Sequence, residues 1–335
     1  MNMKISFGNR LNPVCMVQEI RFPQDNCVLS DTTDFTGIKD ENKINESDHL
    51  KIIGKTLLNG DFQILDYIES GGIADVYLIR DNKGKYYAAK ILKQGLHQKK
   101  HCERFLHEID VLSKFINHPH ILSLITFGNF DERPFIITEL AEDGSLYSKL
   151  KGGNLTLGKA LSYLGQASYG LQAVHEKGFV HRDIKPHNIL IFNGLAKLGD
   201  FDLIKEISEH TSESDDSISG TINYISPEQT DPTNKKLNFK SDVYSLGITA
   251  FHVLTGRLPF RGNACEIIKQ HTDTKPANPG DLNEYIPTEI QNIILVALSK
   301  KPENRPSALE FGECMLGVSN DSKYSLGSSL RLIEQ

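Results

Sequence analysis

Apolar and polar positions alternate along the chain from residue 62 onwards, and this alternation predicts β-strands. Residues 62–68 form the first alternating run, residues 75–80 form the second, and a third run ends at Lys90. Turns rich in small or polar residues separate these runs at 70–74 and 81–84. We therefore expect three consecutive strands in this part of the chain.

The apolar period lengthens further along the chain, which changes the expected structure from strand to helix. A helix is expected around Glu108, and two more strands are expected at 122–130 and 134–140. Beyond Gly144 the apolar positions recur at steps of three and four, which predicts a largely buried helix. The members of this stripe are Leu157, Leu161, Leu164, Ala167, Leu171 and Val174. Strands thus come first in the chain, and helices follow.

Composition narrows the class of protein. The 335 residues, with a mass of 37.5 kDa, can hold one large two-lobed domain plus extensions. A net charge of −6 and a pI near 6.1 give no global basic footprint, so we expect no nucleic-acid partner. Five dispersed cysteines without metal-ligand spacing indicate reduced thiols in a cytosolic protein. The oligomeric state is left open.

No signal-peptide core stands at the N-terminus, and no apolar run is long enough to span a bilayer. We therefore expect a soluble cytoplasmic protein, with delivery into another cell as an open alternative. Residues 1–60 are polar and weakly periodic, which predicts an extension that is disordered or loosely docked. A dedicated regulatory module is the alternative for this extension. Residues 318–335 are expected to form a flexible tail.

The candidate chemistry lies in the stretch 181–188, which reads His-Arg-Asp-Ile-Lys-Pro-His-Asn, and in Asp-Phe-Asp at 200–202. Residues 189–192 and 195–198 predict two strands around an Asn-Gly turn. That hairpin returns the chain, so Asn188 and Asp200 should lie side by side and can hold a metal ion. A carboxylate, an amine, an amide and a second carboxylate in this arrangement are the groups that phosphoryl transfer needs.

These motifs resemble the catalytic loop and metal-binding motif of eukaryotic-type (Hanks-type) Ser/Thr protein kinases. The wording Tyr-x-Ser-Pro-Glu-Gln at 224–229 is closest to that of the bacterial members. The resemblance covers residues 61–317 and implies an α+β, two-lobed protein kinase fold. The small β-rich N-lobe would be formed by residues 61–141 and the larger helical C-lobe by residues 142–317.

The resemblance also implies a role for each catalytic residue. Asp183 would orient the substrate hydroxyl and finally accept its proton, and Lys185 would neutralise charge on the moving phosphoryl group. Lys90 would align the nucleotide while paired with Glu108. Thr221, together with Lys185, favours Ser/Thr over Tyr substrates. Substrates would thus be proteins.

The implied cofactors are ATP and Mg²⁺, with Mn²⁺ as an alternative, and Asn188 and Asp200 would be the metal ligands. The residues around the nucleotide would include the small-residue turn, the strand residues beside it and the hinge, where the backbone of Glu139 and Ala141 would bind adenine. The implied set is Ile68, Gly71, Gly72, Ala74, Val76, Ala88, Lys90, Glu139, Ala141 and Leu190. The chain departs from the family at Glu69, Ala74 and Asp202, where the family has glycines.

Two structural pairs follow from the same resemblance. Asp242 would cap the backbone of the catalytic loop, and Arg305 would pair with Glu228 inside the large lobe. The position of Arg182 before Asp183 implies control by phosphorylation of the activation segment. Residues 208–219 are rich in serine and acidic residues. We expect the enzyme to phosphorylate itself between Thr211 and Ser219, at Thr211, Ser212, Ser214, Ser217 or Ser219.

Two alternatives come from other functional classes. A pseudokinase would bind partners without transferring phosphate, and Glu69 and Asp202 favour it. A small-molecule kinase would share the catalytic loop, but such enzymes lack the docking segment that runs from Thr221 to Glu228. Transfer of ³²P from ATP to a generic protein substrate separates the first alternative from a protein kinase.

Overall fold

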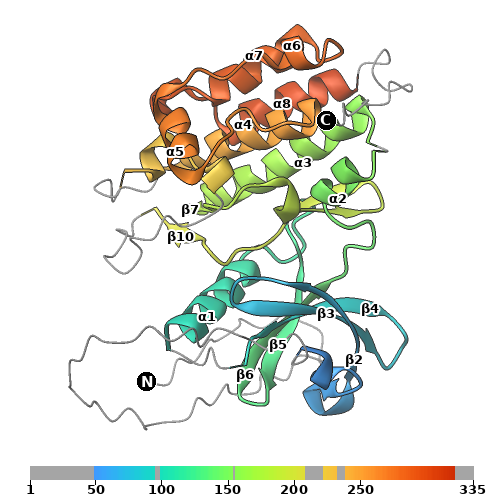
Figure 1. Cartoon of the computed structure of the whole chain (residues 1–335). Helices are drawn as coiled ribbons and strands as arrows, with labels where there is room; N and C mark the ends of the chain where they lie inside the picture. Colours follow the sequence, from blue (N-terminus) through green and yellow to red (C-terminus); the bar gives the residue numbers. More distant parts are fainter. Residues whose placement is uncertain (1–48, 95–98, 154, 208–221, 232–237, 321–335) are drawn as a thin grey trace, which may run out of the picture.

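A computed structural model of the chain describes residues 49–94, 99–153, 155–207, 222–231 and 238–320. One part is a twisted β-sheet with a single long helix beside it, and the other part is almost entirely helical (Figure 1). The chain passes from the first part to the second after residue 139, where the last strand of the sheet ends. The predicted α+β, two-lobed architecture is confirmed.

The small lobe is built on a six-stranded antiparallel sheet in the order β1-β2-β3-β4-β6-β5. Its strands are β1 (Thr56–Leu57), β2 (Phe62–Ser70), β3 (Ala74–Asp81), β4 (Tyr86–Leu92), β5 (Leu124–Phe130) and β6 (Arg133–Glu139). Strand β4 has neighbours on both sides, so Lys90 lies well inside the sheet rather than at an edge. The sheet also includes residues placed in the predicted extension, since β1 pairs with β2 and Leu57 is buried.

Helix α1 (Lys99–Ser113) lies beside the sheet, as its apolar spacing predicts. Phe105, Ile109 and Leu112 are all buried, and Ile136 of β6 belongs to the same core. Glu108 is buried with them, at 4% exposure. A carboxylate in that position needs a cation, because burial without a partner would be costly.

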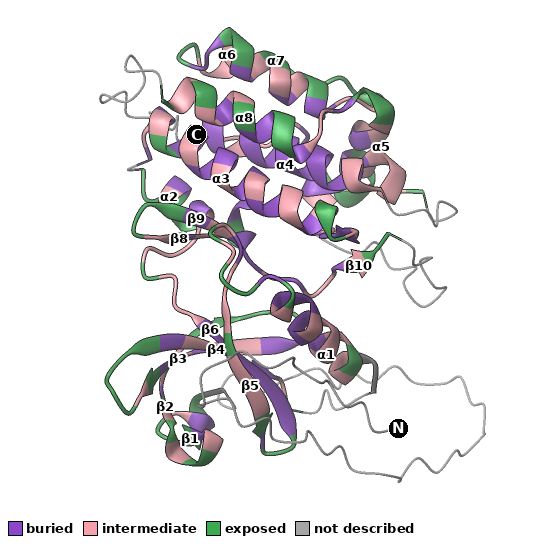
Figure 2. Cartoon of the chain, turned by 180° about the vertical axis from the view of Figure 1, so that it is seen from behind, coloured by how far each residue is buried: buried purple, intermediate pink, exposed green. Residues whose placement is uncertain are grey.

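The large lobe is organised around two long helices that are buried along most of their length (Figure 2). Thr156 and Asn238 accept hydrogen bonds from the first turns of these helices and so fix where each helix begins. The helices of this lobe are α2 (Leu146–Lys151), α3 (Leu157–Glu176), α4 (Phe239–Thr255), α5 (Ala264–Asp273), α6 (Pro279–Leu282), α7 (Thr288–Ala297) and α8 (Ala308–Ser319). The stripe predicted on α3 is buried in full.

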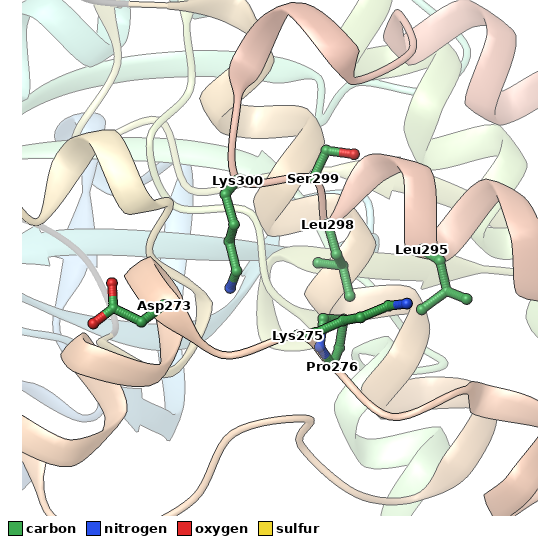
Figure 3. A pocket seen from close by; sticks show the side chains of 7 residues that line it. All are labelled: Asp273, Lys275, Pro276, Leu295, Leu298, Ser299 and Lys300. Atoms are coloured by element: carbon green, nitrogen blue, oxygen red, sulfur yellow. The ribbon is translucent and has the colours of Figure 1, made fainter.

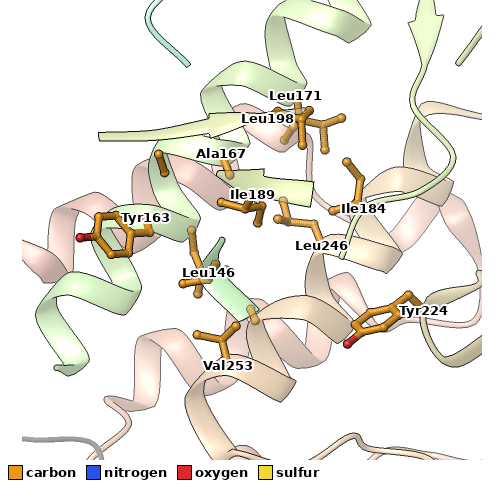
Figure 4. Packing of buried hydrophobic residues seen from close by; sticks show 14 of the residues in the cluster. Leu146, Tyr163, Ala167, Leu171, Ile184, Ile189, Leu198, Tyr224, Leu246 and Val253 are labelled. Carbon is orange, nitrogen blue, oxygen red and sulfur yellow. The ribbon is translucent and has the colours of Figure 1, made fainter. Parts of the chain in front are cut away.

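Short strands form the face of the large lobe that is turned toward the sheet (Figure 1). They are β7 (Phe179–Val180), β8 (Ile189–Phe192), β9 (Leu195–Leu198) and β10 (Lys205–Glu206). Strands β8 and β9 form the predicted hairpin, and both Asn193 and Gly194 in its turn have positive φ. Figure 4 shows Ile184 and Ile189 packed over Leu246 of α4. The loop between β7 and β8 therefore packs on the buried apolar core of the large lobe.

Candidate functional site

The loop between β7 and β8 owes its shape to one buried carboxylate. Asp242 of α4 is 1% exposed, and its two oxygens accept the backbone N–H groups of His181 and Arg182, each at 2.8 Å. The ring of His175 contacts the same carboxylate at 2.9 Å. These bonds support Arg182 at φ 72°, a left-handed conformation that is costly for a residue other than glycine. The predicted cap is thus present.

Asp183 lies on this loop at 8% exposure, and the side chains of Lys185 and Asn188 both donate to its carboxylate. Lys185 Nζ donates to Asp183 Oδ2 at 2.6 Å, and the Asn188 amide donates to the same oxygen at 2.9 Å. Asn188 also donates to the Asp183 backbone carbonyl at 2.8 Å. The carboxylate is therefore held in one orientation, beside a cation that faces the same space. The structure brings together the three side chains that the sequence singled out here.

The residues predicted to bind metal meet at the open end of the β8–β9 hairpin. Gly199 donates to the Asn188 carbonyl at 2.9 Å, which fixes the backbone of Asp200 beside Asn188. Because Asn188 uses its amide nitrogen toward Asp183, its Oδ1 is the atom left for a cation. Asp200 adds carboxylate oxygens, at φ 59°. Amide and carboxylate oxygens are the donors that Mg²⁺ prefers, so these residues fit the ion.

Lys90 joins the sheet to the metal motif. Its ammonium group contacts Glu108 of α1 at 3.0 Å, Asp200 at 3.2 Å and Asp202 at 2.6 Å. The predicted pair with Glu108 is present, and the contact with Asp202 is the shortest of the three. Oxygens of Glu108, Asp200 and Asp202 all lie within 4.8 Å of one another. Three acidic groups thus surround one cation.

Charge and burial set the protonation of this cluster. Burial alone would lower the pKa of Lys90, but the carboxylates of Glu108, Asp200 and Asp202 outweigh it and hold that pKa well above its usual value. Burial raises the pKa of Glu108 well above its usual value despite the charge of Lys90. Burial also opposes ionisation of Asp202, but Lys90 and a hydrogen bond with Glu108 lower the pKa of Asp202. Asp202 is therefore the ionised partner of Lys90.

Helix α1 makes further contacts with the chain that follows the metal motif. Arg104 donates to the Asp202 carbonyl at 3.5 Å, and the ring of His107 contacts the Ile204 carbonyl at 3.1 Å. With the contact between Lys90 and Glu108, these bonds fix the helix against both lobes. No sequence motif indicated the contacts of Arg104 and His107, because they go to backbone atoms.

Four of the side chains predicted to surround a nucleotide are apolar and at least partly exposed, whereas a fifth, Ala74, is buried at 1% exposure. Ile68 is 44% exposed on β2, and Val76, Ala88 and Leu190 are only partly buried. In the small-residue turn, Gly71 donates to the Ala74 carbonyl at 2.8 Å, and Gly72 is exposed. Exposed apolar groups on a sheet and on a facing hairpin are suited to cover a flat aromatic ring.

Glu139 ends β6 at the junction of the lobes, followed by Ala141. Its side chain accepts two hydrogen bonds from Lys197 of β9, at 2.7 and 2.8 Å, and one from the Ser123 backbone at 2.8 Å. This bridge ties the junction to the hairpin that leads to Asp200. The sequence analysis missed Lys197, because nothing in a short apolar strand marks a lysine as the partner of a distant glutamate.

Arg305 forms a two-pronged ion pair with Glu228, at 2.6 and 2.8 Å, and Ser241 donates to the same glutamate at 2.6 Å. Burial opposes ionisation of Glu228, but Arg305 outweighs it and lowers the pKa of the carboxyl. The predicted pair is present and anchors the segment that follows residue 221. Thr221 itself lies outside the described residues.

A pocket of about 250 Å³ lies elsewhere, beside α7 (Figure 3). None of the predicted site residues lines this pocket. The lining residues are Asp273, Lys275, Pro276, Leu295, Leu298, Ser299 and Lys300. Lys300 donates to the backbone carbonyls of Gln270 and His271 and lies over the ring of Phe260 at 4.6 Å. This lysine holds the end of α5 and offers no reactive arrangement.

Comparison with known proteins agrees with this geometry. Residues 62–314 match the protein kinase domain family. The chain is 34% identical to the serine/threonine-protein kinase pkn2 of Myxococcus xanthus over 77% of its length, and 34% identical to PrkC of Bacillus subtilis over 81%. It is 30% identical to PknB of Mycobacterium leprae over 74%.

The chain spans only part of the length of these relatives. The aligned region makes up 32% of pkn2, 42% of PrkC and 41% of PknB. Among the helices that the structure describes, none is long and apolar enough to cross a bilayer.

Proposed function

The chain belongs to the protein kinase family, and from this premise we propose that it transfers the γ-phosphoryl group of ATP to serine or threonine hydroxyls of proteins. The observation that carries the proposal is the fixed orientation of Asp183, held by Lys185 at 2.6 Å and by Asn188 at 2.9 Å. A carboxylate held in this way, next to a cation, suits a hydroxyl acceptor and a phosphoryl donor at once.

Asp183 would hold the substrate hydroxyl in line with the phosphoryl group and take its proton as the new P–O bond forms. Lys185 would stabilise the negative charge that gathers on the transferred group. Both side chains come from a loop that Asp242 fixes through two backbone hydrogen bonds. Positioning and charge stabilisation are the main contributions a protein makes to this reaction.

Lys90 would hold the nucleotide phosphates while it stays paired with Glu108, at 3.0 Å. Asn188 and Asp200 would hold Mg²⁺, which, when bound, neutralises phosphate charge. Mn²⁺ offers the same octahedral oxygen preference. Ile68, Val76, Ala88 and Leu190 would enclose the adenine ring, and the backbone of Glu139 and Ala141 would bind its edge.

The direct test is phosphoryl transfer by the full chain and by Asp183→Asn, with ³²P-labelled ATP and a mixed protein substrate. Wild type should label serine and threonine, and the variant should lose at least a hundredfold in kcat. Binding of ATP should persist in the variant, because in the proposed mechanism Asp183 contacts the accepting hydroxyl and not the nucleotide. Labelling that is equal in the two proteins would overturn the assignment of Asp183, and no transfer at all would leave a nucleotide-binding protein.

We also propose that the protein acts in the cytosol and modifies its own activation segment. Described cysteines Cys102, Cys265 and Cys314 are free thiols, which suits a reducing compartment. The five hydroxyl residues between Thr211 and Ser219 that were predicted as phosphorylation sites lie outside the described residues. Mass spectrometry of the purified chain before and after incubation with ATP tests the modification.

A further inference from the structure

Aromatic and imidazole rings cluster on one side of the catalytic loop. The ring of His187 stacks on that of Tyr147, with centroids 3.8 Å apart and planes 23° apart. Next to them, the hydroxyl of Tyr224 contacts Nδ1 of His252 at 2.8 Å. These residues come from α2, the catalytic loop, the segment after residue 221 and α4, so four parts of the chain meet here.

Helix α4 fixes the position of this cluster relative to the loop that bears Asp183. Ser245 donates to the Tyr224 carbonyl at 2.7 Å, and Thr249 donates to the Ile184 carbonyl at 3.3 Å. The loop that bears Asp183 and the segment that bears Tyr224 are therefore held by one helix. Burial and then the neighbouring groups Tyr147 and Asp183 raise the pKa of Tyr224, so Asp183 lies within electrostatic reach.

Two exposed cations lie on this side of the catalytic loop. Lys151 Nζ lies 5.7 Å from the centre of the Tyr147 ring, and Lys151 is exposed. Arg261 is exposed as well. Burial, and then the neighbouring groups His187, Lys151 and Arg261, lower the pKa of His252 to about 4, and burial also lowers the pKa of His187. Lysine and arginine therefore supply the charge, and the neutral histidines supply hydrogen-bonding nitrogens.

Two carboxylates lie close to this cluster, and each has a lysine partner. Asp143 binds Lys149 at 3.0 Å and accepts the Asn193 backbone N–H at 2.8 Å. Asp183 binds Lys185 at 2.6 Å. Lys151 and Arg261 are thus not neutralised by these two acids. A third carboxylate, Glu266, accepts the Asn263 backbone N–H at 2.9 Å, close to Arg261 in the chain. Exposed cations such as Lys151 and Arg261 favour ligands of negative charge.

We propose that this surface, which we define as Tyr147, Lys151, His187, His252 and Arg261, binds acidic side chains of the substrate beside its accepting hydroxyl. The proposal rests on the proposed protein kinase activity and names the substrate class: serine and threonine flanked by aspartate, glutamate or phosphoserine. An extended peptide rises about 3.3 Å per residue, so a side chain two to four positions from the acceptor reaches roughly 7–13 Å along this surface.

The chain contains a segment of this chemistry. Residues 208–221 read Ser-Glu-His-Thr-Ser-Glu-Ser-Asp-Asp-Ser-Ile-Ser-Gly-Thr, with four acidic residues among the hydroxyls. A basic surface beside Asp183 would favour this sequence as a substrate, presented by the same chain or by a second copy. It would disfavour sequences with arginine or lysine next to the acceptor.

The experiment uses the full chain, MgATP and three synthetic peptides. The first peptide has the sequence of residues 208–221, the second replaces its four acidic residues by their amides, and the third replaces them by lysine. We expect kcat/KM for the acidic peptide to exceed that for the amide peptide by about tenfold, and the lysine peptide to be the poorest. Raising the salt concentration should reduce the preference, because exposed charges are screened.

The variant K151E/R261E should bring the ratio of acidic to amide peptide close to one or invert it. Both side chains are exposed, so the fold should persist. The matched control is Lys301→Glu, which should keep the wild-type ratio. Lys301 is an exposed lysine that follows α7 in the chain and is not part of the defined surface.

Each outcome separates the two proposals. Phosphorylation of all three peptides at similar rates, or a preference for the lysine peptide, would overturn the acidic preference while leaving the kinase activity in place. An unchanged ratio in K151E/R261E would overturn the assignment to this surface. No phosphorylation of any peptide or of the mixed protein substrate would overturn the proposed function itself.

Discussion

Replacing Asp202 by asparagine should tighten the binding of nucleotide without metal. In the structure Asp202 accepts a hydrogen bond from Lys90 at 2.6 Å. We propose that the same ammonium group binds the phosphates of the nucleotide. The family motif has glycine at this position, so the bond is a property of this chain. Nucleotide phosphates must compete with Asp202 for Lys90 and must also approach its negative charge.

The contacts of Lys90 allow an estimate of the size of this effect. A hydrogen bond to a charged group contributes about 1.5–3 kcal/mol. Lys90 also contacts Glu108 at 3.0 Å and Asp200 at 3.2 Å. We expect these contacts to persist in the variant and to keep stabilising Lys90 without nucleotide, so the gain in nucleotide affinity should be smaller than the full energy of the lost hydrogen bond. We therefore expect a gain of about 1–2 kcal/mol, or roughly five- to thirtyfold in affinity. Asparagine keeps the shape of the side chain and restricts the backbone as aspartate does.

The assay is titration calorimetry of ADP in EDTA, repeated with Mg²⁺. The gain should shrink when Mg²⁺ is present, because the ion already neutralises part of the phosphate charge. Asp131→Asn is the matched control: Asp131 is also ion-paired, with Lys55, but lies in the turn between β5 and β6. Equal or weaker binding of metal-free ADP by Asp202→Asn would refute the competition.

Three further predictions concern activity and stability. Lys90→Met and Asp200→Asn should each lower phosphoryl transfer at least a hundredfold, about 3 kcal/mol, with unchanged circular dichroism. Arg305→Met should cost about 3–5 kcal/mol in urea unfolding, because it leaves the buried charge of Glu228 unpaired, and a loss below 1 kcal/mol would contradict this. Burial, aided by Lys300, lowers the pKa of His271 to about 4, so the stability it confers is full above pH 6.5 and lost as the pH falls toward 4. His271 should therefore contribute about 2 kcal/mol to the fall in the free energy of unfolding between pH 7 and pH 5, and this contribution should be missing in His271→Gln, whereas His252, whose pKa is also lowered to about 4, contributes in both proteins.

The parts of the fold that sequence could predict are those governed by local periodicity. Residues 62–68, where apolar and polar positions alternate, lie in β2, and the residues around Glu108 with helical apolar spacing form α1. The hairpin of β8 and β9 followed from its Asn-Gly turn, which only a few backbone conformations can accommodate. The motif resemblance predicted the residues of the site, and Asp183, Lys185 and Asn188 come together because they lie on one short loop.

Contacts between distant segments were not predictable in the same way. Asp202 was visible as a departure from glycine, but its bond to Lys90 depends on how the backbone turns after Asp200, which adopts φ 59°. The bridge from Lys197 to Glu139 depends on the relative placement of a hairpin and a strand from different lobes. Nor did periodicity show that β1 joins the sheet, since a strand of two residues carries no period.

The two sides of Asp183 carry opposite excess charge, and this has one measurable consequence. On the proposed nucleotide side, the carboxylates of Asp200 and Asp202 outnumber Lys90, whereas on the other side Lys151 and Arg261 lie beside neutral rings. Salt screens attraction and repulsion alike. Added salt should therefore weaken the binding of an acidic peptide while it relieves the repulsion of metal-free nucleotide. A single excess of one sign across the whole site would shift both affinities in the same direction.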